Sequence, residues 1–157
     1  AGATRGLPIA ERPATGGLRS SWDDTRGWTE DDPVPSAALA VIRTLRDRVR
    51  HVSGCLVASV DGRLIAHDTH AVEPDGMAAL SAAVLGLSQR LVMTVEHDQF
   101  AETVTRGTRG YVATYAAGPH AVLTVIAAPE ANVGRLHLES RRVAMRIAHL
   151  LGPAGTR

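Results

Sequence analysis

The sequence predicts an α+β domain in which a five-stranded antiparallel sheet carries helices on both of its faces. Helical periodicity recurs in three segments, near residues 36–50, 74–96 and 132–151. Five short segments of strand length lie between them, which gives the order α-β-β-α-β-β-β-α. Two connections, Asp61-Gly62 and residues 107–110, carry tight-turn residues that favour hairpins and therefore antiparallel pairing.

The first helix and the first hairpin come directly from local signals. Ser36 is a suitable N-cap for a helix that we expect to end near Arg50. The apolar run 55–60 predicts a strand, and Leu64 to Ala66 predicts its return. Between them, Asp61-Gly62 fits a type I′ turn, which needs positive φ at both positions.

The second half of the chain contributes one helix, three strands and a final helix. Pro74 and Asp75 suit the first turn of a helix that we expect to reach about Glu96. Residues 100–106 alternate and are rich in Thr, which is typical of an edge strand. Residues 121–128 are the most apolar, so we place that strand at the centre of the sheet.

Composition sets the broad class. A chain of 157 residues, 45% hydrophobic and 21% charged, suits one globular domain with a substantial core. The formal net charge of +1 favours neither nucleic acid nor an anionic membrane as a partner. The longest apolar segment is interrupted by Ser88, Gln89 and Arg90, so no membrane-inserted helix is expected. The polar N-terminus and the lone Cys55 are typical of a cytoplasmic protein.

Residues 1–34 differ from the rest of the chain because they are rich in Gly and Pro and lack an apolar period. We expect a flexible tail there, a folded domain over residues 35–152 and a short C-terminal end at 153–157. Both tryptophans, Trp22 and Trp28, lie in an acidic part of the tail. Such a segment is either a short docking motif with aromatic anchors or a poorly ordered extension.

No motif supports catalysis. Cys55 lies within an apolar strand, which indicates a buried structural thiol rather than a nucleophile. His67, Asp68 and His70 lack further ligands at a recognisable spacing, so no metal site is expected. No glycine-rich loop has the Gly-Lys-Ser/Thr ending of a phosphate loop. The sequence therefore predicts a non-enzymatic protein without a cofactor.

The segment 75–96 predicts a helix that is apolar on all sides, with Gln89 and Arg90 as the only strongly polar residues between Met77 and Val95. We expect one stripe to cover the protein's own sheet, and it consists of Leu80, Val84, Leu87, Leu91 and Val95. The opposite side has small residues four apart, namely Ala78, Ala82 and Gly86. No other element is available to cover that side, so we expect a second copy or another protein to do so.

Several segments together resemble the roadblock family, the bacterial relatives of the dynein roadblock light chains. They are Val52-Ser53-Gly54-Cys55-Leu56-Val57 leading into Val60-Asp61-Gly62-Arg63-Leu64-Ile65-Ala66, then Met77-Ala78-Ala79-Leu80, the strand 121–127, and Asn132-Val133-Gly134-Arg135-Leu136. Their order and spacing together carry the resemblance over roughly residues 36–151. The resemblance implies a roadblock-like fold and a homodimer, in which the middle helices pair and the third strands join two sheets.

The resemblance further implies a regulator or scaffold of Ras-like small GTPases in a signalling system, with a sensor kinase as a possible further partner. The GTPase would dock on the paired helices. Arg90 is the obvious exposed arginine there, although no family motif marks it as catalytic and a solubilising role is the simpler interpretation. The residues expected at the dimer or partner interface are Ala78, Ala82, Leu85, Gly86, Gln89, Arg90, Met93, Phe100, Glu102, Val104 and Arg106.

A ligand-sensing domain of the PAS or GAF kind is the alternative, because such domains also combine a five-stranded antiparallel sheet with helices. A sensor needs a pocket with a few convergent polar groups. The interior strands of this sequence offer few of these, and the helices at both ends favour the roadblock interpretation. An enzyme is the third and weakest alternative, since no catalytic motif is present.

Overall fold

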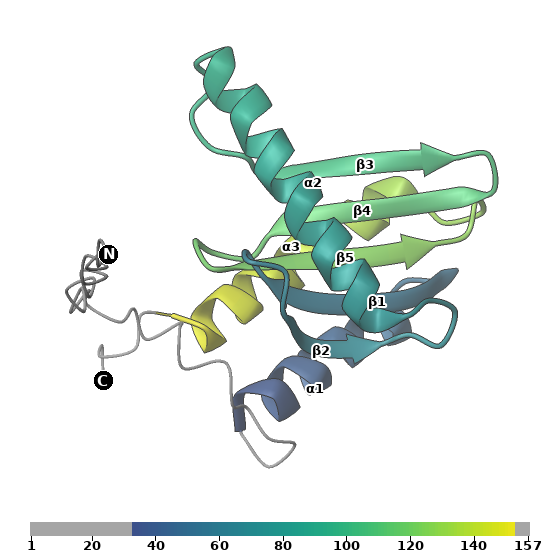
Figure 1. The fold of residues 1–157 in the computed structure, drawn as a ribbon. Coiled ribbons are helices and arrows are strands. Elements are labelled where there is room, and N and C mark those ends of the chain that lie inside the picture. Colours follow the sequence, from purple (N-terminus) through teal and green to yellow (C-terminus); the bar gives the residue numbers. More distant parts are fainter. Residues whose placement is uncertain (1–32, 153–157) are drawn as a thin grey trace, which may run out of the picture.

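The computed structural model describes residues 33–152. Of the tail expected over residues 1–34, only Pro33 and Val34 are described, and they belong to the first helix; the rest of the tail and residues 153–157 lie outside the described residues. The described elements occur in the predicted order: α1 (Pro33–Arg48), β1 (Val52–Ser59), β2 (Leu64–Asp68), α2 (Pro74–Thr94), β3 (Glu102–Gly107), β4 (Gly110–Ala116), β5 (Ala121–Ala127) and α3 (Val133–Leu150) (Figure 1).

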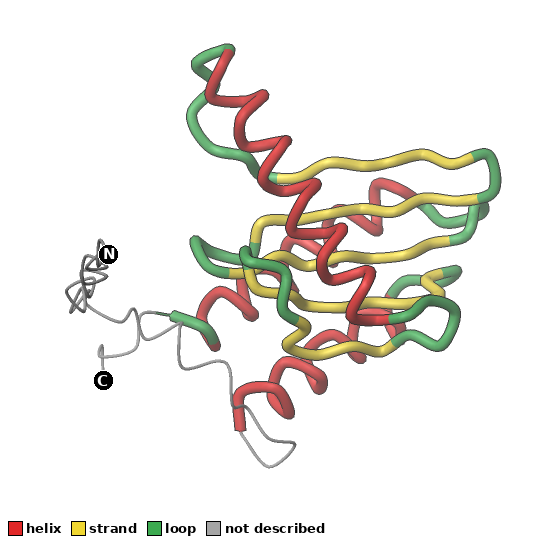
Figure 2. The backbone as a smooth tube through the Cα atoms, in the orientation of Figure 1, coloured by secondary structure: helices red, strands yellow, loops and turns green. Residues whose placement is uncertain are grey.

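In the described part of the chain, five strands form one antiparallel sheet in the order β2-β1-β5-β4-β3. The apolar strand β5 lies at the centre, as predicted, and β3 lies at one edge. Helices α1 and α3 lie side by side on one face, whereas α2 crosses the other face diagonally (Figure 2). The sequence-based fold class is therefore confirmed.

The main core lies between the sheet and the α1–α3 layer. Its largest fully buried side chains include Ile42, Leu45, Leu123, Val125, Leu136 and Ile147. The Asn132 side chain caps α3, because its Oδ1 accepts a hydrogen bond of 2.9 Å from the Arg135 backbone N–H. The packed layer of sheet, α1 and α3 thus supports the opposite face of the sheet, on which α2 lies.

The first helix and the first hairpin differ in detail from the sequence-based expectation. Helix α1 begins at Pro33, so Ser36 lies inside the first turn rather than at the N-cap. The β1–β2 hairpin is confirmed, but the predicted type I′ turn is wrong because only Gly62 has a positive φ, +91°. The Gly62 N–H donates to the Ser59 carbonyl at 3.0 Å, and the Arg63 N–H donates to Ser59 Oγ at 3.0 Å. The connection is longer than two residues, and therefore one left-handed glycine suffices.

The third strand begins at Glu102, two residues later than predicted. Phe100 instead lies in the connection from α2, where its side chain is buried and its N–H donates to Gln89 Oε1 at 2.9 Å. The prediction that Phe100 lies on the edge strand is therefore wrong. The cause is the Gln89 side chain, which satisfies the backbone of Phe100 in place of a strand neighbour.

Candidate functional site: the outward face of α2

A side-chain cap and a proline define the start of α2. The Glu73 carboxylate accepts hydrogen bonds from the backbone N–H groups of Asp75, at 2.9 Å, and Gly76, at 2.6 Å. Pro74 occupies the first turn, where its missing N–H costs no helical hydrogen bond. The helix then runs for 21 residues across the sheet.

Small side chains hold α2 against the sheet. Ala78 is fully buried and Ser81 nearly so, and Ala78 packs in a small apolar cluster with Leu56, Ala58 and Val122. A buried hydrogen bond accompanies this packing: Thr124 Oγ1 of β5 donates to Ser81 Oγ at 2.6 Å. The Ser81 hydroxyl in turn donates to the Met77 carbonyl at 2.8 Å. These contacts fix the rotation of α2 about its own axis.

Three of the four leucines of α2 point away from the sheet, whereas Leu85 packs against the small apolar cluster beneath the helix. Leu80, Leu87 and Leu91 are 63%, 65% and 70% exposed, with the half-buried Val84 alongside. We call these four residues the leucine face. Our expectation that this stripe covers the sheet and that Ala78 faces a partner is therefore wrong.

Steric fit explains the reversed orientation. At Gly62 of the β1–β2 hairpin, a Cβ atom would lie 3.4 Å from the Ala79 Cα and 3.7 Å from the Ala82 Cβ, so the hairpin backbone lies close to α2. Larger side chains on that side would hold the hairpin and sheet away from the helix. The polar Thr124 also requires a hydroxyl partner beneath the helix, and Ser81 supplies it.

The other predicted interface residues of α2 differ in their exposure. Gly86, Arg90 and Met93 are exposed, and an added Cβ at Gly86 would meet no atom within 4 Å. Ala82 and Leu85 are half-buried. The Gln89 side chain is occupied within the protomer by the backbone of the following loop. Their role in an interface remains a prediction.

The C-terminal part of α2 projects beyond the edge strand β3 (Figure 1). Met93 and Val95, near its end, are 62% and 55% exposed. By length and composition alone α2 could cross a membrane, since an 18-residue window has a mean hydropathy of 1.3 and is 11% buried. The packing of Ala78 and the Ser81–Thr124 hydrogen bond instead tie the helix to its own sheet.

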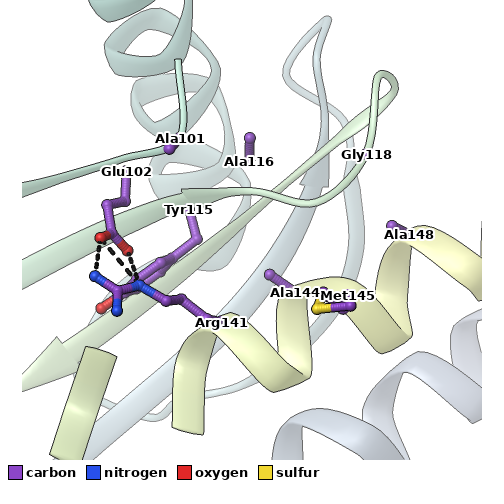
Figure 3. A pocket seen from close by; sticks show the side chains of 9 residues that line it. All are labelled: Ala101, Glu102, Tyr115, Ala116, Gly118, Arg141, Ala144, Met145 and Ala148. Carbon is purple, nitrogen blue, oxygen red and sulfur yellow. Dashed lines mark hydrogen bonds and ion pairs between the residues drawn. The ribbon is translucent and has the colours of Figure 1, made fainter. Parts of the chain in front are cut away.

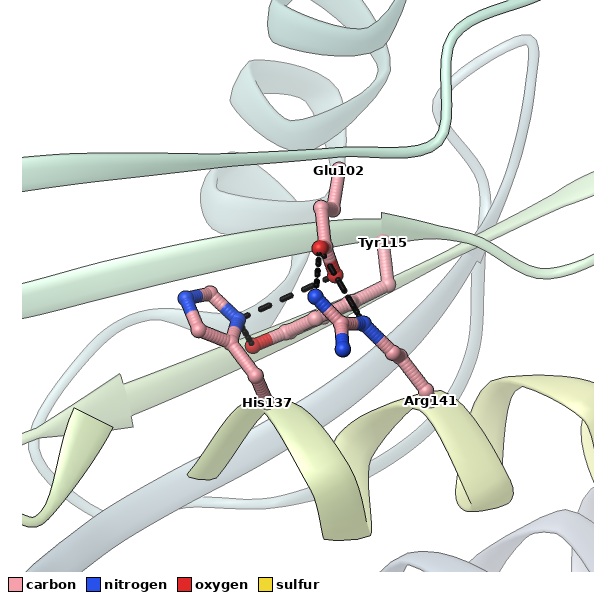
Figure 4. Close-up of polar contacts among 4 residues, drawn as sticks. All are labelled: Glu102, Tyr115, His137 and Arg141. Atoms are coloured by element: carbon pink, nitrogen blue, oxygen red, sulfur yellow. Dashed lines mark hydrogen bonds and ion pairs between the residues drawn. The ribbon is translucent and has the colours of Figure 1, made fainter. Parts of the chain in front are cut away.

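The edge strand β3 presents the remaining predicted interface residues. Glu102 accepts hydrogen bonds from the Arg141 guanidinium of α3 and lies 3.8 Å from His137 Nδ1 (Figure 4). The bond from Arg141 holds the pKa of the Glu102 carboxyl below its usual value. Val104 packs against the main core, and Arg106 is exposed. Glu102 is therefore engaged within the protomer.

A family model described as Roadblock/LC7 domain matches residues 40–127. The chain belongs to the Roadblock/LC7 family. The sequence-based recognition of this family is thereby confirmed. A search of curated proteins finds no match.

Solved structures share the fold of this Roadblock/LC7 domain. One is MglB in a tetrameric arrangement, with 24% identity, a TM-score of 0.69, and coverage of 76% of this chain and 90% of that one. A second is the gliding protein MglB from Thermus thermophilus, with 22% identity, a TM-score of 0.68, and coverage of 76% and 91%. A third is a Roadblock/LC7 domain from Streptomyces avermitilis, with 22% identity, a TM-score of 0.66, and coverage of 72% and 96%.

Two features of this Roadblock/LC7 domain were not found from the sequence. Glu139 of α3 is buried between Arg48 and Arg142, each 3.6 Å away. Tyr115 of β4 lies beneath the Glu102 cluster, where its hydroxyl is 2.8 Å from His137 Nδ1 and burial raises its pKa to about 12. The Arg48–Glu139 and Tyr115–His137 contacts join different elements of the fold, so sequence spacing carried no signal for them.

No side-chain group suited to holding a metal occurs among residues 33–152, where no three His, Cys, Asp or Glu side chains gather for that purpose. Cys55 is buried, and the desolvation of its thiolate raises the pKa of the thiol to about 12. A thiol in this state is a poor nucleophile at neutral pH. The candidate functional surface of the described part is therefore the leucine face, whose three leucines are 63–70% exposed.

Proposed function

We propose that this Roadblock/LC7 domain forms a homodimer through α2 and acts as a non-enzymatic regulator or scaffold of a Ras-like small GTPase in a cytoplasmic bacterial signalling system. A sensor kinase of the same system is a further candidate partner. The observation that carries the proposal is the leucine face, whose three leucines are 63–70% exposed in the protomer. Fully burying an exposed leucine contributes roughly 1.5–3 kcal/mol, and each of these leucines still has most of that area to bury, so covering all three favours association.

A second copy of the same chain suits this surface. In a two-fold dimer the same patch meets itself, so an apolar helix face needs no different complementary surface. The edge strand β3 supports the same arrangement, because one side of its backbone has no strand neighbour in the described sheet. The end of α2 projects over this edge, and therefore helix pairing and strand pairing would occur on the same side of the domain.

Family membership supports a GTPase as the client of the dimer. Paired α2 helices would present a surface that is apolar at its centre, with Arg90 as the charged residue between Asp75 and Glu96. The Arg90 side chain is exposed, so its charge is available to an acidic group of a partner. The exposed part of α2 thus offers a partner both an apolar contact area and a charged side chain, as a scaffold requires.

The direct test is a binding assay with the small GTPase encoded beside this gene, loaded with GDP or with a GTP analogue. We expect the wild-type protein to bind at least one of the two states. Arg90→Glu should weaken that binding, whereas Arg109→Glu, in the β3–β4 turn away from α2, should not. Failure of a dimeric wild-type protein to bind either state, or equal losses in the two variants, would contradict the proposed client surface.

A further inference from the structure

A pocket of about 260 Å³ lies on the face of the sheet opposite α2 (Figure 3). It is bounded by α3, by the start of β3 and by the β4–β5 turn. Its walls are mainly apolar and include Ala101, Ala116, Ala144, Met145 and Ala148. Met145 stands at its rim and is 64% exposed, whereas Glu102 and Arg141 neutralise each other at one end. The pocket therefore suits a large apolar or aromatic side chain.

The helix beside this pocket is basic. Its charged residues are Arg135, Arg141, Arg142, Arg146 and a single acid, Glu139. The acid is only 8% exposed, and the four arginines are exposed. Arg141 pairs with Glu102 and Arg142 with Glu139, so Arg135 and Arg146 are the arginines of α3 without an acidic partner among the described residues. The solvent side of α3 therefore favours an acidic ligand that carries an aromatic group.

We propose that residues 20–32 of this chain dock on α3, with Trp22 in the pocket. This segment contains both tryptophans of the protein and five acidic residues against one arginine. The acids are Asp23, Asp24, Glu30, Asp31 and Asp32. An indole supplies a large area for burial in the apolar pocket, and the acids complement the arginines of α3. The inference is independent of any GTPase.

The connection of the chain makes this docking possible. The start of β1 pairs with the end of β5, Val52 with Ala127, at one end of the sheet. Because α1 runs toward that end and α3 runs away from it, α1 begins at the opposite end, where α3 finishes and the pocket lies (Figure 1). The segment before Pro33 therefore starts on the correct side of the domain.

Chain length decides between the two tryptophans. Packed helices lie about 8–10 Å apart, so a segment starting at α1 must cross α3 and cover roughly 15–20 Å to reach the pocket beyond it. At about 3.5 Å per residue, Trp28 reaches at most about 17 Å from Pro33 and Trp22 about 38 Å. Trp22 therefore reaches the pocket without full extension of the chain, whereas the backbone at Trp28 reaches only the short end of that range, and only when fully extended.

Single-tryptophan variants test the docking directly, because both tryptophans lie in this segment. Trp28→Phe leaves Trp22 as the only reporter, and Trp22→Phe leaves Trp28. We expect the Trp28→Phe protein to emit at shorter wavelength and to resist quenching by acrylamide more than the Trp22→Phe protein does. Raising the salt concentration should shift its emission toward the red, since screening weakens the acid–arginine attraction.

A matched pair of substitutions on α3 locates the contact. In the Trp28→Phe background, Met145→Glu places a charge at the pocket rim, whereas Leu138→Glu places one on an exposed part of the same helix outside the pocket. Losing the Met145 contact should weaken docking about tenfold or more. Emission should move to the red in Met145→Glu and stay unchanged in Leu138→Glu, with circular dichroism confirming that both fold.

Three results would overturn the proposal. One is fully solvent-exposed emission from Trp22 in the parent protein. Another is an equal response, or no response, in the Met145→Glu and Leu138→Glu variants. The third is a red shift caused by Leu87→Glu instead, because it would place the segment on the leucine face of α2.

Discussion

The buried hydroxyl pair of Ser81 and Thr124 fixes how α2 lies on the sheet. We therefore expect the effects of removing the two hydroxyls on the free energy of unfolding to be coupled rather than additive. Thr124 Oγ1 is fully buried in β5 and donates to Ser81 Oγ at 2.6 Å. Ser81 donates in turn to the Met77 carbonyl at 2.8 Å. The two hydroxyls thus form a short chain that ends on the helix backbone.

The free energies follow from which group is left without a partner. Ser81→Ala leaves the Thr124 hydroxyl buried without its acceptor, which costs about 1–3 kcal/mol. Thr124→Val removes one hydrogen bond at almost constant volume and leaves Ser81 on the Met77 carbonyl, at a cost of about 0.5–1.5 kcal/mol. The double variant leaves no unpaired donor, so it should be about 1 kcal/mol more stable than the sum of the single effects predicts.

Urea unfolding of the four proteins, at one fixed protein concentration, measures this coupling. Thr105→Val, at an exposed position of β3, is the control for the change of side chain and should alter stability by less than about 0.5 kcal/mol. Additive effects, within about 0.3–0.5 kcal/mol, would refute the view that these hydroxyls depend on each other.

Three further predictions concern other parts of the domain. The pKa of the Glu102 carboxyl is lowered in the folded protein, so its pairing with Arg141 stabilises the protein at pH values above the ordinary pKa of 4.5. This stabilisation is lost as the pH falls through the lowered pKa. Unfolding titrations at different pH values should show that Glu102→Gln removes this acid-dependent loss. Cys55 should react with a thiol reagent at pH 8 only as fast as the protein unfolds, because its pKa is about 12. Gly54→Ala should destabilise the protein by about 1–3 kcal/mol, since the added Cβ would lie 2.6 Å from Thr69 Oγ1. Gly86→Ala should instead stabilise a monomeric variant by about 0.5–1 kcal/mol, because the added Cβ meets no atom within 4 Å and alanine favours the helix. Thermal unfolding compares the two variants.

The sequence was sufficient for the architecture, because its signals are local. The apolar run of β5 marked the central strand, the Thr-rich β3 marked an edge, and Asn132 marked the start of α3. The conformation of the β1–β2 turn could not be predicted from the sequence. Asp-Gly is compatible with several hairpin connections, and the length of the loop, set by strand register, selected a single left-handed Gly62.

The orientation of α2 could not be predicted because both of its faces are apolar. Placing the larger side chains inside is a sound rule when the opposite face is polar, and here it is not. The decisive partners, Thr124 and Gly62, lie on other elements and set the spacing and polarity beneath the helix. The same limit applies to Glu102, whose partner Arg141 is 39 residues away in sequence.

Light scattering across a range of micromolar concentrations tests the central claim that the leucine face joins two copies of this domain. The wild-type protein is predicted to have twice the chain mass of 16.6 kDa. Leu87→Glu should reduce it to the mass of one chain, whereas Leu138→Glu, on an exposed part of α3, should leave it a dimer. A wild-type protein that is monomeric throughout, or a Leu87→Glu variant that stays dimeric, would contradict the claim.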